Sequence, residues 1–343
     1  MKSRLLTRRE LDNLSEAGNM QALIADLART PYRRPLEVAL VHLVGREAVS
    51  RGVRAELEQT LARIHRFYDG DAGSNVELVL QVYDVHNLKA ILRGLTSHAT
   101  PGEIEAALLP VGQLTGDILA ELARAANPRA AIDLLASMSL PSAIPLLRLR
   151  AERPGAGTLE MEVRLEQWYF EEAFARLQES RDETLAAALR LEADLTNVQT
   201  VLRLAAKPEE QDAIREWLGT DEVGSLLVGP GRIPLAMLVR AANRETVTEA
   251  VQLLAETVYA GPLQAALSVY SETGRLSSFE RQLHRYRLDT LARLIARDPL
   301  GIGVVLGYLA LKINEVNNLR WIANGIHLRM TPENIRAELM YAP

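Results

Sequence analysis

One short helical pattern occurs three times in the sequence and constrains the fold more than any other feature. An acid is followed by asparagine at i+3, by Leu or Val at i+4 and by Ile or Val at i+7, so that all four share one helix face. The acids and asparagines are Asp84 and Asn87, Asp194 and Asn197, and Glu315 and Asn318. About five restricted positions are expected to match at roughly one start point in 10⁵. Three matches in one chain therefore indicate an internal repeat.

The flanking segments repeat in the same order. Thirteen positions beyond the asparagine, "TPGEIEAAL" begins at Thr100 and "TPENIRAEL" at Thr331, and the middle copy has "KPEEQDAI" at Lys207. Threonine followed by proline is typical of a helix start. Similar pieces also open each copy: "RLLTRREL", "VGQLTGDIL" and "GPGRIPLAM". We predict three helical repeats, 1–110, 111–226 and 227–343, in a pseudo-threefold ring or funnel, although an open solenoid fits the same pattern.

The residue preferences are helical almost throughout the 343-residue chain. Alanine, leucine, arginine and glutamate dominate, and the alternating β-branched pattern of strands is almost absent. We predict an all-α protein, built of three pseudo-symmetric helical bundles. Glycine and proline clusters predict loops at 70–75, 153–157, 219–224 and 228–234.

Charge and composition exclude several classes of site. The net charge of −5 gives no general attraction to phosphate, so we expect no nucleic-acid partner. The absence of cysteine excludes disulfides and thiolate metal sites. The longest uncharged stretch, 299–311, is shorter than the roughly 18–20 residues of a membrane span, and we expect it to form a core helix. The N-terminus lacks the apolar run of a secretory signal, so we expect the chain to face the cytoplasm.

No catalytic, cofactor or metal site is predicted. The sequence has neither a phosphate-binding loop nor an H-E-x-x-H helix, and its six histidines are scattered singly. We expect the three tryptophans, Trp168, Trp217 and Trp321, to pack in the core. Gly303 and Gly307 form a small-x-x-x-small pair that predicts close helix packing.

The polar residues of the repeated motif have two interpretations. They form a buried hydrogen-bonded network that fixes how the copies meet, or they reach a surface and contact a partner. Basic residues accompany the motif unevenly: the first copy has Lys89 and Arg93, the second keeps only Arg203, and the third keeps only Arg320.

The strings "DVHNLKAILRG" (84–94) and "YLALKINEVNNLR" (308–320), with the "LLTRREL" opening and the "TPENIRAEL" ending, resemble the C subunit of the V/A-type ATPases, the counterpart of the d subunit of eukaryotic V-ATPases. The resemblance covers the whole chain. It implies a funnel-shaped, non-catalytic rotor component at the cytoplasmic face of the membrane, peripheral to it and without a span of its own. Its expected partners are the D and F subunits of the central stalk and the membrane ring of proteolipid subunits, and we expect the isolated chain to be a monomer.

Carried over position by position, the resemblance assigns structural or stalk-contacting roles to nine residues: Asp84, Asn87, Arg93, Asp194, Asn197, Arg203, Glu315, Asn318 and Arg320. Two alternatives remain. One is a free cytosolic helical-repeat adaptor that binds other proteins. The other is an all-α enzyme that uses a pair of carboxylates as acid and base. The recurrence of the acid in all three copies disfavours the enzyme, since an active site is normally a single asymmetric constellation.

Overall fold

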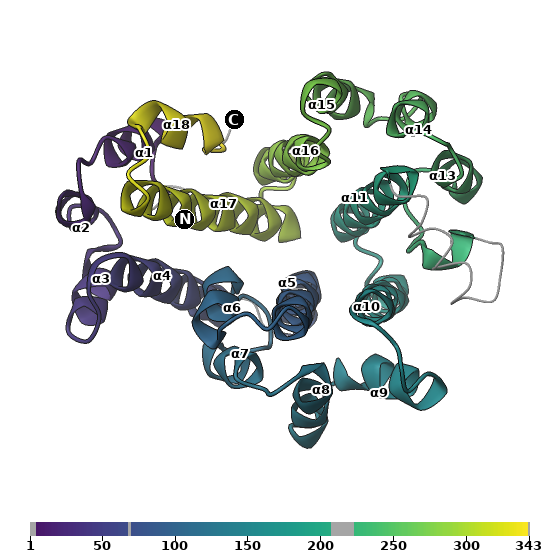
Figure 1. The fold of residues 1–343 in the computed structure, drawn as a ribbon, viewed down its shortest axis with the longest axis horizontal. Coiled ribbons are helices and arrows are strands. Elements are labelled where there is room, and N and C mark those ends of the chain that lie inside the picture. Colours follow the sequence, from purple (N-terminus) through teal and green to yellow (C-terminus); the bar gives the residue numbers. More distant parts are fainter. Residues whose placement is uncertain (1–4, 68–69, 207–222, 342–343) are drawn as a thin grey trace. The chain divides into compact units, whose positions relative to one another are not determined.

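The computed structural model describes residues 5–67, 70–206 and 223–341, and all regular structure in these ranges is helical (Figure 1). The predicted all-α class is confirmed. The chain divides into two compact units, Met1–Met138 with Leu291–Pro343, and Ser139–Thr290. In the described part of the chain, no helix combines the length and the apolarity that a membrane crossing needs.

The first unit contains most of the N-terminal helices and the C-terminal pair. They are α1 (Arg8–Ser15), α2 (Met20–Leu27), α3 (Arg33–Leu40), α4 (Gly45–Phe67), α5 (Gly70–Thr96), α6 (Pro101–Ala107), α7 (Gly116–Ala123), α8 (Pro128–Ser137), α17 (Ile302–His327) and α18 (Pro332–Glu338). The long helix α17 lies beside α4 and is also contacted by α1, α2, α5 and α18 (Figure 1). It is therefore the central helix of this unit.

The second unit is built around α11, which carries the middle copy of the motif. Its elements are α9 (Ala143–Glu152), α10 (Thr158–Ser180), α11 (Glu183–Ala206), the short 3-10 helix η2 (Val223–Leu226), α13 (Leu235–Ala242), α14 (Val247–Leu254) and α15 (Ala260–Thr273). Helix α16 (Ser277–Arg297) begins in this unit, and its last turns belong to the first. Helices α10, α13 and α14 pack on α11.

Two predicted helix starts are confirmed by their caps. Thr100 accepts a hydrogen bond from the backbone N–H of Glu103, and Thr331 accepts one from Asn334; in each case proline occupies the first helical position. These caps satisfy donors that the first turn of a helix leaves unpaired. The corresponding middle segment, which begins at Lys207, lies outside the described residues.

One predicted loop is wrong. Residues 70–75 form the first turns of α5, whereas 153–157 and 228–234 connect helices as expected; most of the fourth predicted loop, 219–222, lies outside the described residues. Helix α5 buries Val76, Leu78 and Leu80 directly after the glycine-rich stretch. Packing of this kind overrides the weak helix preference of glycine and serine.

Helix α17 is a core helix, as predicted, and Gly307 allows α16 to approach it closely. A Cβ atom at Gly307 would lie only 2.7 Å from the backbone oxygen of Leu291. The expectation of buried tryptophans is wrong for Trp321, which is 37% exposed, and Trp168 is half-buried; Trp217 lies outside the described residues. Position 321 lies off the buried face of α17, which at this end carries Leu319 and Ile322.

Candidate functional site: three motif junctions

Each motif asparagine binds both backbone polar groups of one residue further along the chain. Its Nδ2 donates to that residue's carbonyl oxygen and its Oδ1 accepts from the same residue's N–H; the pairs are Asn87 with Leu109, Asn197 with Val228, and Asn318 with Met340. The Nδ2–O distances are 2.6, 2.6 and 2.7 Å, and the N–Oδ1 distances are 2.8, 2.8 and 3.0 Å. Because all three asparagines are buried, each pairing satisfies groups that would otherwise be costly to bury.

The two motif aspartates bind backbone N–H groups that precede α7 and α13. Asp84 accepts from Gln113 at 2.8 Å and from Leu114 at 3.1 Å. Asp194 accepts from the corresponding pair, Arg232 at 2.9 Å and Ile233 at 3.1 Å.

A glycine immediately precedes each of these pairs of donors. A Cβ atom at Gly112 would collide with the carboxylate of Asp84, and one at Gly231 with that of Asp194. Glycine is therefore required for the backbone to close around the acid.

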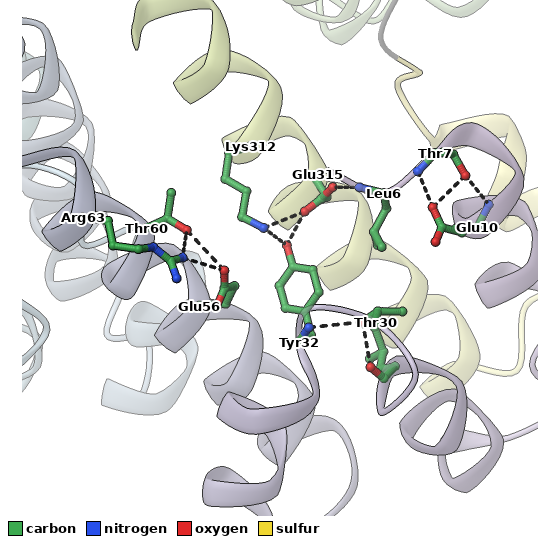
Figure 2. A network of polar contacts seen from close by, with 11 residues as sticks. Leu6, Thr7, Glu10, Thr30, Tyr32, Glu56, Thr60, Arg63, Lys312 and Glu315 are labelled. Carbon is green, nitrogen blue, oxygen red and sulfur yellow. Dashed lines mark hydrogen bonds and ion pairs between the residues drawn. The ribbon is translucent and has the colours of Figure 1, made fainter. Parts of the chain in front are cut away.

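Glu315 makes the third contact of this kind, to the N-terminal segment of the chain. It accepts from the backbone N–H of Leu6, which directly precedes the N-cap of α1, Thr7 (Figure 2). It also accepts from the hydroxyl of Tyr32 at 2.6 Å and from Nζ of Lys312 at 2.8 Å. We call these sets the Asp84 junction (Asp84, Asn87, Leu109, Gln113, Leu114), the Asp194 junction (Asp194, Asn197, Val228, Arg232, Ile233) and the Glu315 junction (Glu315, Asn318, Leu6, Met340).

Lys312 is fully buried and charged, and its partners explain how that is tolerated. Besides Glu315, it donates to the Tyr32 hydroxyl at 2.9 Å, and its Nζ lies 4.4 Å from the centre of the Tyr32 ring. A buried ammonium group needs such a complete set of partners. Burial raises the pKa of Tyr32 well above its usual value, and the Glu315 carboxylate raises it further, so the tyrosine remains a donor.

The three acids differ in what surrounds them besides the backbone. Tyr259 donates to Asp194 at 2.7 Å, and burial together with this carboxylate raises the pKa of its hydroxyl. In the sequence, Ser142 occupies the position that corresponds to Tyr32 and Tyr259. Burial raises the pKa of Asp84 to about 6, although its two backbone hydrogen bonds oppose the shift.

The basic residues predicted as site residues differ in exposure. Arg93 and Arg203 are exposed on α5 and α11. Arg320 is half-buried on α17, where burial and the like charge of Arg54 lower its pKa to about 10. In the described residues, no set of three or more His, Asp or Glu side chains is arranged to hold a metal ion.

Sequence reasoning missed several of the interacting residues. Tyr32 and Tyr259 stand three residues before aligned prolines, so a full alignment of the copies could have indicated them. The glycines Gly112 and Gly231 also align with each other. An alignment of the copies could not have indicated Lys312, because the other two copies have Gln81 and Leu191 at its position.

Comparison with known proteins identifies the family. The sequence model of the ATP synthase (C/AC39) subunit family matches residues 1–338. The C subunit of the A-type ATP synthase of Methanosarcina acetivorans is 26% identical over 99% of this chain and 90% of its own length. The C subunit of the V-type ATP synthase of Deinococcus radiodurans is also 26% identical, over 99% of this chain and 88% of its own. The chain thus belongs to the ATP synthase (C/AC39) subunit family, as the resemblance predicted, and is a structural subunit of a rotary ATPase rather than an enzyme.

Proposed function

We propose that this chain is the central-rotor subunit that links the D and F subunits of the central stalk to the proteolipid ring of a V/A-type ATPase. In this role it lies at the cytoplasmic face of the membrane and transmits torque between ATP turnover and ion movement. The three repeats, 1–110, 111–226 and 227–343, meet through the three junctions. Asp84, Asp194 and Glu315 hold the repeats together, and Asn87, Asn197 and Asn318 fasten the segment that follows each motif helix. Arg93, Arg203 and Arg320 are candidates for contact with the stalk.

The observation that carries the proposal is the hydrogen bond from Leu6 to Glu315. The acid of the first repeat binds the opening of the second, and the acid of the second binds the opening of the third. Glu315, in the third repeat, binds the opening of the first. Each acid therefore binds a segment that opens a repeat, which supports the proposal that the chain is built of three like units.

Stiffness is the physical requirement for a subunit that transmits torque. Each junction fastens a loop to a long buried helix through three or more hydrogen bonds at buried polar groups. Such fully paired groups favour one arrangement over alternatives, because any displacement leaves polar groups unpaired in a medium of low dielectric constant.

The test is coupling in membrane vesicles that contain the complete ATPase, compared with vesicles from a strain that lacks this chain. Without the chain, we expect ATP hydrolysis to persist while ATP-driven ion transport is lost, and addition of the purified chain should restore transport. Normal coupled transport in the absence of the chain would refute the rotor role. A chain that never co-purifies with the detergent-solubilised complex would favour the adaptor.

A further inference from the structure

A cavity of about 580 Å³ lies beside the Glu315 junction, within the first unit. Cavities of about 300–1,000 Å³ are the size that small-molecule ligands occupy in proteins. The wall is formed by the segment before α1, by α1, by the end of α16, by α17 and by the segment after α18, and we call it the α1–α17 cavity. Its apolar lining includes Leu5, Leu6, Leu11, Leu311, Met340 and Tyr341.

Asn314, on α17, lines the cavity and has a buried amide group that is only partly hydrogen-bonded. The residue is 5% exposed, and its Nδ2 donates to the carbonyl oxygen of Met340 at 2.7 Å. Because this bond uses the amide nitrogen, Oδ1 is left as an acceptor, and no donor reaches it among the described residues. Buried acceptors in proteins are normally paired, so an acceptor of this kind at a cavity indicates a ligand.

The fold does not require the amide of Asn314. Asn318 donates to the same carbonyl oxygen at 2.7 Å and also accepts from the N–H of Met340, as the motif asparagine does in every repeat. Tyr83 and Ala193 stand at the position of Asn314 in the other two copies. The buried amide is therefore a feature of the third repeat alone, and a ligand that donates a hydrogen bond would complete its pairing.

Two arginines at the cavity favour an anion. Arg293, on α16, is exposed and has no ion pair or hydrogen bond in the described part of the chain. Arg8 lies over the ring of Tyr341, 4.4 Å from its centre, and only 3.9 Å from the carboxylate of Asp12, at the limit of an ion pair. Glu315 also lines the cavity, but its carboxylate already accepts from three donors. An anionic group would therefore gain charged donors there.

A second cavity of about 580 Å³ lies beside the Asp84 junction and differs in its charged groups. It is lined in part by Gly112, the glycine that contacts Asp84. Its two arginines are already bonded: Arg51 pairs with Glu58 at 3.3 Å, and Arg54 donates to a backbone carbonyl oxygen at 2.7 Å. Volume alone does not distinguish the two cavities, whereas the unpaired groups favour the α1–α17 cavity as a binding site.

We propose that the α1–α17 cavity binds a small amphipathic hydroxycarboxylate. Its apolar body lies against Leu11 and Leu311, its carboxylate meets Arg8 and Arg293, and its hydroxyl group donates to Oδ1 of Asn314. A cationic ligand fits less well because the two arginines repel it, and a doubly charged phosphate fits less well because Glu315 lines the same cavity. The proposal does not depend on the rotor function.

Isothermal titration calorimetry of the full chain with β-hydroxydecanoate tests the proposal. We expect saturable binding at one site, and Arg293→Gln should weaken it at least fivefold because the carboxylate loses a charged donor. Arg297→Gln is the matched control, at an exposed arginine one turn further along α16 that does not line the cavity, and should stay within twofold of wild type. Ala292→Met places a longer side chain in the wall and should abolish binding.

Decanoate, which lacks the hydroxyl group, tests the role of Asn314. Wild type should bind it several times more weakly than β-hydroxydecanoate, whereas Asn314→Ala should bind the two acids equally. A purely structural role of Asn314 would not change this preference. Hydrogen exchange gives a second readout: the bound acid should slow exchange in segment 339–341, which lines the cavity, and leave segment 108–114 unchanged.

Several outcomes would overturn the proposal. Absence of saturable binding by wild type would do so, and so would equal affinities of wild type, Arg293→Gln and Ala292→Met, since the acid would then bind elsewhere. Equal binding of the two acids by wild type would remove Asn314 from the site, and tighter binding of decylamine than of decanoate would contradict an anionic ligand. Sedimentation with anionic vesicles without binding of the free acids would assign the arginines to a lipid surface. None of these outcomes affects the rotor function, which ion transport tests separately.

Discussion

The Asp84 and Glu315 junctions make similar backbone contacts but differ in the groups that surround the charge of the carboxylate. In both, a carboxylate on a long buried helix accepts a hydrogen bond from the backbone just before another helix, and an asparagine one turn later clamps a loop residue. At Glu315 the negative charge is met by the buried ammonium group of Lys312 and by a tyrosine hydroxyl (Figure 2). Among the described residues, only backbone N–H groups donate to the carboxylate of Asp84.

The difference shows that the backbone contacts of a junction do not depend on which group compensates the charge of its carboxylate. The backbone contacts are common to the junctions and define the connection, whereas the compensating groups vary from one to another. The Glu315 junction, which connects the N-terminal segment to α17, contains an ion pair between Glu315 and Lys312. In the described part of the chain, no cation is paired with Asp84, and we expect the stability of this junction to depend on pH.

The largest expected effect comes from Lys312→Met. It leaves the Glu315 carboxylate buried without its cation, and breaking a buried pair typically costs about 3–5 kcal/mol in the free energy of unfolding. The measurement is chemical denaturation of the full chain. Gln81→Met, at the aligned position of the Asp84 junction, is the control and should cost less than about 1 kcal/mol, since no charge is left unpaired. If Lys312→Met is as stable as wild type, charge compensation is not what distinguishes this junction.

The next effect is expected from Asn197→Leu in the Asp194 junction. Both hydrogen bonds to Val228 are lost, and two buried backbone groups lose their partner, which costs about 2–4 kcal/mol at about 1–2 kcal/mol for each group, the lower part of the usual range. Asn243→Leu, at an exposed asparagine, serves as the control. Thermal melting should separate the two variants by several degrees. Equal melting temperatures would mean that the asparagine clamp contributes nothing to stability.

Tyr259→Phe tests how much a side-chain donor contributes to the stability of the Asp194 junction. It removes one hydroxyl donor from Asp194 and should lower the free energy of unfolding by about 1.5–3 kcal/mol, the usual contribution of a hydrogen bond to a charged group. In an Asp194→Asn background the same change should cost clearly less, because the acceptor is then neutral. A double-mutant cycle with no coupling between the two residues would contradict this contact.

The smallest effect is a pH dependence at Asp84. Its pKa of about 6 in the folded chain exceeds the value of about 3.9 for an unfolded aspartate. The folded state therefore binds the proton more tightly. The resulting stabilisation is fully present below about pH 4 and is lost as the pH rises through about 6. Relative to Asp84→Asn, wild type should lose roughly 1–2 kcal/mol of stability between about pH 4.5 and 7.5.

The control for this titration is Asp117→Asn, at an exposed aspartate of α7, measured over the same pH range. Parallel stability curves for wild type and Asp84→Asn would show that burial does not perturb this carboxyl group.

Much of the fold and part of the candidate site could be predicted from the sequence. The helical class follows from residue preference, and the burial of Asp84, Asn87 and their counterparts follows from their spacing with apolar residues. The threonine caps at Thr100 and Thr331 could be predicted because their chemistry is local.

The remaining features depend on contacts between distant segments. No local pattern shows that Glu315 binds Leu6, 309 residues away, or that Tyr32 and Lys312 meet beside it. The helix at 70–75 was missed because apolar packing further along α5 outweighs the preference of glycine and serine for loops. The exposure of Trp321 was missed because residue type alone does not show which helix face is covered.

The central claim is that the acids and asparagines of the motif are junctions that hold loops to long helices. Hydrogen exchange of the full chain, followed by mass spectrometry on segments 108–114, 227–233 and 339–341, tests it most directly. We expect all three segments to exchange slowly although they lie outside helices, and Asn87→Leu should accelerate exchange in 108–114 while leaving 227–233 unchanged. Exchange at the rate of unprotected loops in the wild-type chain, or no change with Asn87→Leu, would contradict the claim.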